Sequence, residues 1–394
     1  MSGTTVSRRS SGARLWFVVH GWLALPIWAF LFFVCLTGSI ATVSQEIVWL
    51  ASPAVRANAP GPDATLRGYD EVLAAVEQQQ PGARVRFISR PVKSIFALNV
   101  RVTRPDGTSG ALFVNPYTAV IQGEQGAFDF QQFVRALHGW LLLSGDNSRI
   151  GWYLVSALSI PLLGSLITGI VVYKRFWRIY LRPRLRVSKG RRVFWGDLHR
   201  LAGAWSIPFI AIMAVTAGWF LVRAILDDNH ISISTAGVPP VVARGDVPVV
   251  AKGAPAPRIT LGQAAEAVRA QLPDLEPTFV QFPSSAYDHI SVGGRGAYPL
   301  LFETVDVNPY NGKVERTRRV SDRSALELVT GSMRPLHTGD FAGVWLKLVY
   351  LVFGLILTTL VFSGMMVWTR RTAIETVKLV RERKPARLGL EAAE

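Results

Sequence analysis

Four long apolar stretches alternate with polar segments along the 394-residue chain. They run over Leu15–Val43, Ile150–Tyr173, Leu201–Leu226 and Gly343–Thr369. Each provides the about 20 mostly apolar residues that a helix needs to cross a bilayer. The first stretch is too long for the core of a signal peptide, and no obvious small-residue cleavage site follows it. We therefore predict four transmembrane helices, the first of them retained.

The two long segments between these stretches have patterns that resemble each other. Each contains a helical period, over Tyr69–Gln80 and Leu261–Leu272, followed by runs that alternate apolar and polar residues. Each also ends in Val-Asn-Pro-Tyr, at 114–117 and 307–310, which suits a tight turn between two strands. We predict that each segment is a small α+β unit with one helix on an antiparallel sheet. The chain then consists of two copies of helix, outer domain and helix.

Composition and charge support a membrane protein and give its orientation. Hydrophobic residues make up 49% of the chain and charged residues 18%, with a net charge of +16. The basic residues lie beside the apolar stretches, which is typical of cytoplasmic loops and argues against nucleic-acid binding. The single Cys35 excludes a disulfide framework and a thiolate zinc site.

The basic residues form three groups, which we expect to be cytoplasmic. These groups are Arg8, Arg9 and Arg14; Lys174, Arg175, Arg178, Arg182, Arg184, Arg186, Lys189, Arg191 and Arg192; and Arg370, Arg371, Lys378, Arg381, Arg383, Lys384 and Arg387. Both termini are then cytoplasmic, and the two long segments are periplasmic in a bacterial inner membrane.

Four of the six histidines occupy matched places in the two copies. His20 and His199 lie near the inner ends of the first and third helices, and His138 and His337 lie just before the second and fourth. Neutral imidazole is a good axial ligand for haem iron. Because each face of the membrane receives one pair, we predict two haem b groups, ligated by His20 with His199 and by His138 with His337.

Glycines and arginines near these histidines are further candidates for the haem sites. The small pairs Thr168-Gly169 and Ser363-Gly364 are expected at the depth of the inner haem, where they would make room for it. Gly38 and Gly218 belong to similar clusters that could lie deeper than the outer iron. Near the outer histidines, Arg135, Arg149 and Arg334 are candidates to pair with haem propionates. His230 is expected at a solvated helix end and His289 on the surface.

The phrases Leu137-His138-Gly139-Trp140 and Leu336-His337-Thr338-Gly339, with the Asn-Pro-Tyr turns and the Thr-Gly and Ser-Gly pairs, resemble the PepSY-associated transmembrane helix family. The resemblance extends from about Arg14 to Arg371. It implies a haem-containing reductase of ferric siderophores. It also implies a membrane α-helical fold: a four-transmembrane-helix bundle with two periplasmic α+β PepSY-like domains related by an internal two-fold repeat.

The expected organisation divides the chain into eight parts. They are the N-terminus and first helix (1–43), the first PepSY-like domain (44–149), the second helix (150–173), the basic cytoplasmic loop (174–200), the third helix (201–226), the second PepSY-like domain (227–342), the fourth helix (343–369) and the cytoplasmic tail (370–394).

The function expected from these features is electron transfer from a cytoplasmic reductant or a quinol, through the inner pair and then the outer pair of histidines, to a ferric siderophore in the periplasm. No Gly-rich dinucleotide turn follows a predicted strand, so NAD(P)H or flavin would have to bind a separate partner. Two alternatives stay open: a siderophore or metal transporter of the inner membrane, and a non-catalytic PepSY regulator of a periplasmic partner.

Overall fold

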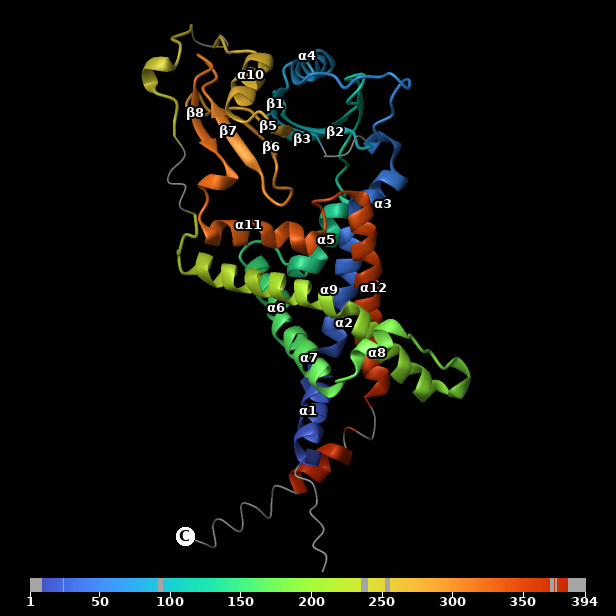
Figure 1. Cartoon of the computed structure of the whole chain (residues 1–394). Coiled ribbons are helices and arrows are strands. Elements are labelled where there is room, and N and C mark those ends of the chain that lie inside the picture. The colour runs from blue at the N-terminus through green and yellow to red at the C-terminus, as the bar shows by residue number, and fades with distance from the viewer. Residues whose placement is uncertain are drawn as a thin grey trace, which may run out of the picture. The chain divides into compact units, whose positions relative to one another are not determined.

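A computed structural model describes most of the chain (Figure 1). The described residues are 9–23, 25–90, 95–234, 240–251, 256–368, 372 and 374–381. Arg8, Arg370, Arg371, Arg383, Lys384 and Arg387 of the predicted cytoplasmic groups lie outside them. The chain divides into a helical unit, residues 1–42, 134–229 and 347–394, and a sheet unit, residues 43–133 and 230–346.

Four helical segments are long and apolar enough to cross a membrane, as the sequence predicts. They are Arg14–Thr42, Asn147–Val172, Arg191–Asp228 and Val344–Val367. The third is longer than predicted, because α9 begins at Arg191 and continues for 38 residues. His199 therefore lies within this helix rather than before it.

Proline shapes the first and third spans differently. The first consists of α1 (Arg9–Leu23) and α2 (Trp28–Thr42), separated by a short 3-10 turn that contains Pro26. Proline removes one backbone hydrogen bond and crowds the preceding turn, which accounts for a break. Pro208 is instead accommodated inside a continuous α9.

The spans pack on one another as a bundle. α1 contacts α7 (Ser159–Val172), and both α7 and α6 (Asn147–Ala157) contact α9. The indole Nε1 of Trp28 donates to the Val361 carbonyl at 2.8 Å, which joins α2 to α12 (Val344–Val367). Phe209 of α9 stacks on Phe353 of α12. We call the end of the bundle next to Arg14 and Arg191 the basic end.

The sheet unit contains one antiparallel sheet of eight strands, in the order β4-β3-β2-β1-β5-β6-β7-β8. The first segment supplies β1 (Arg84–Ser89), β2 (Leu98–Thr103), β3 (Ser109–Val114) and β4 (Ile121–Glu124). The second supplies β5 (Glu276–Gln281), β6 (Ile290–Arg295), β7 (Glu303–Val307) and β8 (Val314–Arg318).

Two separate sheets were expected, whereas the structure joins them along β1 and β5. The joining pairs are Phe87 with Gln281, Ile88 with Val280, and Ser89 with Phe279. A four-stranded sheet with an open edge exposes unpaired backbone groups, and pairing the two edges satisfies them.

Helices α4 (Tyr69–Gln79) and α10 (Leu261–Gln271) cover the same face of this sheet (Figure 1). Val72 and Val76 of α4 pack on Ile88, and Val268 of α10 packs on Val292, all of them buried. Both helices lie within one residue of their predicted bounds. Because strand side chains alternate between faces, residues next to these core positions lie on the opposite face, which α4 and α10 do not cover.

The Asn-Pro-Tyr phrases form the predicted turns between strands. The Asn115 side-chain oxygen accepts from the Tyr117 backbone N–H at 2.8 Å, between β3 and β4. Asn308 accepts from Tyr310 at 3.0 Å in the same way, between β7 and β8. Asparagine is favoured here because its side-chain oxygen can accept a hydrogen bond from the backbone N–H two residues later.

Candidate functional site

Two histidines from different spans meet at the basic end of the bundle. His20 lies on α1 and His199 on α9, and their ring centroids are 6.3 Å apart with planes inclined at 62°. The sequence analysis pairs these two residues, and the structure brings them together. The site is therefore a pair of neighbouring imidazoles in an edge-to-face arrangement.

His20 is held by the second span. Its Nδ1 lies 2.9 Å from the Thr168 hydroxyl, and the Ser165 backbone also forms a hydrogen bond with it. Gly169 follows Thr168, and a Cβ atom at Gly169 would lie 3.4 Å from the Cε1 atom of His20. The small pair in α7 thus contacts the imidazole directly.

His199 is held by the fourth span in the same manner. Its Nδ1 lies 3.2 Å from both the Leu360 carbonyl and the Ser363 hydroxyl. A Cβ atom at Gly364 would lie 3.3 Å from the Cε1 atom of His199. Each copy therefore uses a hydroxyl, the carbonyl three residues before it and the following glycine.

His138 has an equivalent holder in the first span. It lies in the last turn of α5 (Phe130–Trp140), and its Nδ1 is 3.1 Å from the Val34 carbonyl and 3.5 Å from the Thr37 hydroxyl. A Cβ atom at Gly38 would lie only 2.7 Å from the His138 Cε1 atom. His20 of the first span is thus held by the second span, and His138, which precedes the second span, is held by the first.

The hydroxyl groups fix which ring nitrogen carries the proton. Thr168 donates to the Gly164 carbonyl of its own helix at 2.7 Å, and Thr37 donates to the Phe33 carbonyl at 2.9 Å. Since a hydroxyl has one proton, each must accept from the histidine, as the neighbouring carbonyls also must. The tautomer is then Nδ1–H, and Nε2 keeps a lone pair that can bind a metal.

The structure shows what the predicted glycines contact, and their role at a haem stays a prediction. Gly169, Gly364 and Gly38 make room for the imidazole rings themselves, because their nearest neighbours are histidine atoms. Gly38 lies directly against His138, and its depth relative to an outer iron stays a prediction. Gly218 lies nearest to Ser159, whose Oγ atom would be 3.6 Å from an added Cβ.

The remaining outer candidates lie on two helices. Arg135 lies on α5, exposed, one helical turn before His138. His337 lies in the last turn of α11 (Ala325–Thr338), and Arg334 is exposed one turn before it. His337 belongs to the sheet unit and His138 to the helical unit. Their pairing and the propionate contacts of both arginines stay predictions.

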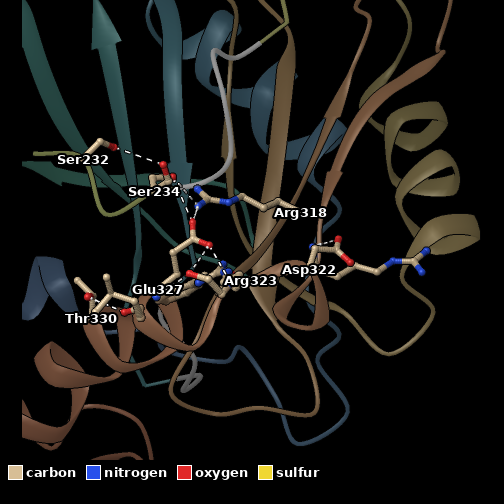
Figure 2. A network of polar contacts seen from close by, with 11 residues as sticks. Ser232, Ser234, Arg318, Asp322, Arg323, Glu327 and Thr330 are labelled. Carbon is tan, nitrogen blue, oxygen red and sulfur yellow. Dashed lines mark hydrogen bonds and ion pairs between the residues drawn. The ribbon is translucent and has the colours of Figure 1, made fainter.

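A buried carboxylate fixes the start of α11 (Figure 2). Glu327 accepts from the Arg318 guanidinium of β8 at 2.9 Å and from the Ser234 hydroxyl at 3.2 Å. Its other oxygen accepts from the Ser324 backbone N–H at 3.0 Å, and the Ser324 hydroxyl caps the helix in return. This network ties the helix that carries His337 to the sheet.

Three other residues of the sequence analysis have clear positions. His230 is exposed, as expected. His289 is buried rather than on the surface, because its Nε2 lies 2.8 Å from the Glu315 carboxylate. Arg149, a candidate to pair with the propionates, donates a hydrogen bond to Asp228 at the end of α9 at 2.6 Å.

Sequence reasoning missed two residues that position the site. Gly151 of α6 lies against the backbone of Trp140, at the end of α5, and leaves no room for a Cβ atom. Asp197, buried two residues before His199, binds Arg186 at 2.8 Å and Arg200 at 2.5 Å. The sequence does contain a signal for Asp197, because it is an acidic residue within the otherwise basic segment 174–200.

Comparison with known proteins places these features in a family. The family model described as the PepSY-associated TM region matches residues 17–371. The uncharacterized protein PA4219 of Pseudomonas aeruginosa is 27% identical over 257 residues, which cover 57% of this chain and 60% of that protein. The match therefore spans less than two thirds of the relative. Since the family model covers most of the sequence, the chain belongs to the PepSY-associated transmembrane family.

Proposed function

We propose that this protein carries electrons across a membrane by means of haem and reduces ferric iron, held by a siderophore, on the far side. The observation that carries the proposal is the neighbouring pair His20 and His199, each with Nδ1 hydrogen-bonded and Nε2 left as the possible metal ligand. Ionisable side chains within membrane spans are costly and usually mark a functional pathway.

The spacing of this pair fits a ligated iron. An imidazole nitrogen binds a first-row metal at about 2 Å and lies about 1.1 Å from its ring centre, so two opposed ligands have ring centres about 6 Å apart. The observed separation of 6.3 Å agrees with this value. Haem, when bound, supplies a one-electron carrier, and the chain supplies ligation, orientation and a low-dielectric surrounding.

The hydrogen bonds at Nδ1 of the two histidines also support iron ligation. The hydroxyl and carbonyl groups at Nδ1 orient each ring and raise its basicity, as partners of metal-bound histidine generally do. His138 has this arrangement as well. We therefore assign His138 to an outer haem and, by the internal repeat, His337 as its second ligand, with Arg135 and Arg334 near the propionates.

The charge pattern supports a direction for the transfer. Basic residues gather at one end of the spans, which favours that end as cytoplasmic in a bacterial inner membrane. His20 and His199 then receive electrons from a cytoplasmic reductant or a quinol. His138 and His337 lie toward the periplasm, where the ferric siderophore is the acceptor.

The visible spectrum of the purified protein tests the proposal. A low-spin six-coordinate haem signal and about two haems per chain are expected. His20→Ala and His199→Ala should each remove the same haem, and His138→Ala should remove the other. His230→Ala is the matched control, because this histidine is exposed, and it should leave the spectrum unchanged.

A colourless preparation from haem-replete cells would refute the proposal. Transport of a siderophore by such a preparation would favour the transporter instead. If His20→Ala and His199→Ala remove different haems, the pairing is wrong even though the protein binds haem.

A further inference from the structure

A row of aromatic and cationic side chains crosses the face of the sheet that α4 and α10 do not cover. The row contains Arg101, Phe87, Phe279, Phe302 and Arg295, which we call the aryl row. Phe87 and Phe279 flank the core residues Ile88 and Val280, and Arg101 lies between the buried Val100 and Val102. Strand alternation therefore turns these side chains away from α4 and α10.

Ring contacts make the row continuous across the joined strands. Phe87 of β1 stacks on Phe279 of β5, with centroids 5.6 Å apart and planes inclined at 19°. Phe302 follows at 6.2 Å from Phe279. The row thus spans the seam between the two halves of the sheet.

A guanidinium lies at each end of the row. The Arg101 Cζ atom is 5.2 Å from the Phe87 ring centroid, and the Arg295 Cζ atom is 4.7 Å from that of Phe302. Such cation–π contacts favour guanidinium groups laid on ring faces, with their edges directed outward. The exposed Arg101 guanidinium therefore keeps N–H groups for an anion, whereas the Arg295 side chain is only 13% exposed.

The charge at the row is only partly balanced. The Arg101 side chain is exposed, and within the described part of the chain it has neither an ion-pair nor a hydrogen-bond partner. Arg295 donates to the Asp340 backbone carbonyl at 3.2 Å, and its Nη2 lies 3.8 Å from the Asp340 carboxylate. The row as a whole keeps an excess of positive charge.

Gly293 of β6 leaves room for the Phe279 ring at the centre of the row. Gly293 pairs with Phe279 across the strands, and a Cβ atom there would lie 2.2 Å from the Phe279 ring. The ring consequently lies flat over the backbone of β6, and Phe302 remains 39% exposed beside it. The aryl row thus has one exposed ring, Phe302, and one exposed guanidinium, Arg101, with half-buried rings between them.

We propose that the aryl row binds an anionic, aryl-bearing iron chelate of the tricatecholate class. This inference rests on the proposed function and specifies its substrate. Catecholate rings can pack against this aromatic strip, and their oxygens can accept from the guanidinium groups, above all from that of the exposed Arg101. A neutral hydroxamate chelate offers neither aromatic rings nor net charge, so the row discriminates against it.

Binding is measured with a redox-inert probe, the gallium(III) complex of a hexadentate tricatecholate, on the full chain in nanodiscs of neutral phosphatidylcholine. Calorimetry should show saturable binding to the wild type. Arg101→Gln should weaken it about 10- to 100-fold, the usual range for one charge-assisted hydrogen bond. Phe302→Leu, which keeps the apolar volume but removes the ring, should weaken it several-fold.

The control is Arg269→Gln, which removes the same charge from an exposed position of α10 on the other face of the sheet. It should bind the probe as the wild type does. Gallium(III) tris-acetohydroxamate, a neutral complex, should bind weakly and equally to all variants.

Three outcomes would overturn the inference: no binding to the wild type, equal affinity in Arg101→Gln, or equal affinity for the neutral complex. Gallium(III) is not reduced, so this result is independent of the haem spectrum. Probe binding by a haem-free protein would refute the proposed function alone, and a haem-replete protein without probe binding would refute this inference alone.

Discussion

The glycines beside the three held histidines differ in how much space they leave. An added Cβ would be 2.7 Å from His138 at Gly38, 3.3 Å from His199 at Gly364 and 3.4 Å from His20 at Gly169. The first distance cannot be accommodated without movement, whereas the last is an ordinary contact. A graded response to alanine is therefore expected at these positions.

Gly38→Ala should destabilise the protein by about 1–3 kcal/mol, the usual cost of overpacking. It should also displace the His138 ring and lower haem retention at the outer site. Gly169→Ala should change both quantities little, and it is the matched control. Thermal unfolding in detergent and a haem count measure the two effects. Equal responses at both positions would contradict the geometry.

A second residue-scale expectation concerns the buried contact of His289 with Glu315. Burial alone would raise the pKa of Glu315, but hydrogen bonds from His289 and Asn308 offset this effect and lower the pKa overall. A carboxyl whose pKa is lower in the folded state contributes stability above its unfolded pKa of about 4.3. This stability is lost as pH falls through the folded pKa.

The melting temperature of the wild type should therefore fall more steeply than that of Glu315→Gln as the pH drops below about 4.3. Unfolding is followed by circular dichroism from neutral pH downward. Glu266→Gln, at an exposed position of α10, is the control and should retain the wild-type slope. Parallel curves for the wild type and Glu315→Gln would show that this carboxyl makes no such contribution.

At the scale of elements, the helix that carries His337 depends on its first turn. Glu327 links this turn to β8 through Arg318 and closes the capping box with Ser324. Its removal leaves the Arg318 guanidinium and the Ser324 N–H without this acceptor.

Glu327→Ala should destabilise the start of α11 by about 1–3 kcal/mol. Hydrogen exchange of the backbone amides of residues 325–328 should accelerate accordingly, while exchange in α4 should not change. Glu77→Ala, an exposed glutamate of α4, is the control. Unchanged protection at residues 325–328 would mean that the network does not hold the helix.

The elements themselves were largely accessible from the sequence, because apolar periodicity directly reflects which faces are buried. The four spans, both sheet helices and the Asn-Pro-Tyr turns lie where the pattern predicts them. The contact of Gly38 with His138 and the burial of His289 could not be predicted, since each depends on which distant residue packs opposite. The residues next to each position in the sequence do not identify that distant partner.

For the whole molecule, the joining of the two sheets is the main feature that the pattern did not predict. Strand alternation identifies a buried face but not which edges pair. Besides the β1 and β5 pairs, Asp70 of α4 reinforces the join. Its carboxylate accepts from the backbone N–H groups of Leu261 at 2.7 Å and Gly262 at 2.6 Å, at the start of α10.

Asp70→Ala should therefore destabilise the second half of the sheet unit through a residue of the first half. The expected cost is about 1 kcal/mol, as for the loss of a helix cap. Hydrogen exchange at Leu261 and Gly262 should accelerate. Asp63→Ala, at an exposed position of the same segment, should have no effect there. Protection that persists in Asp70→Ala would exclude this coupling between the halves.

The joined sheet also has a consequence for biosynthesis. Strand β1 is an interior strand of the finished protein, and it ends at Ser89. Its partner β5 begins only at Glu276, after two complete spans and the basic loop. Until the ribosome has delivered that partner, the newly made first half presents Phe87, Ile88 and Ser89 along a bare strand edge. Such an edge readily recruits a foreign strand. The β1 edge is thus open to pairing with other chains until β5 has been synthesised.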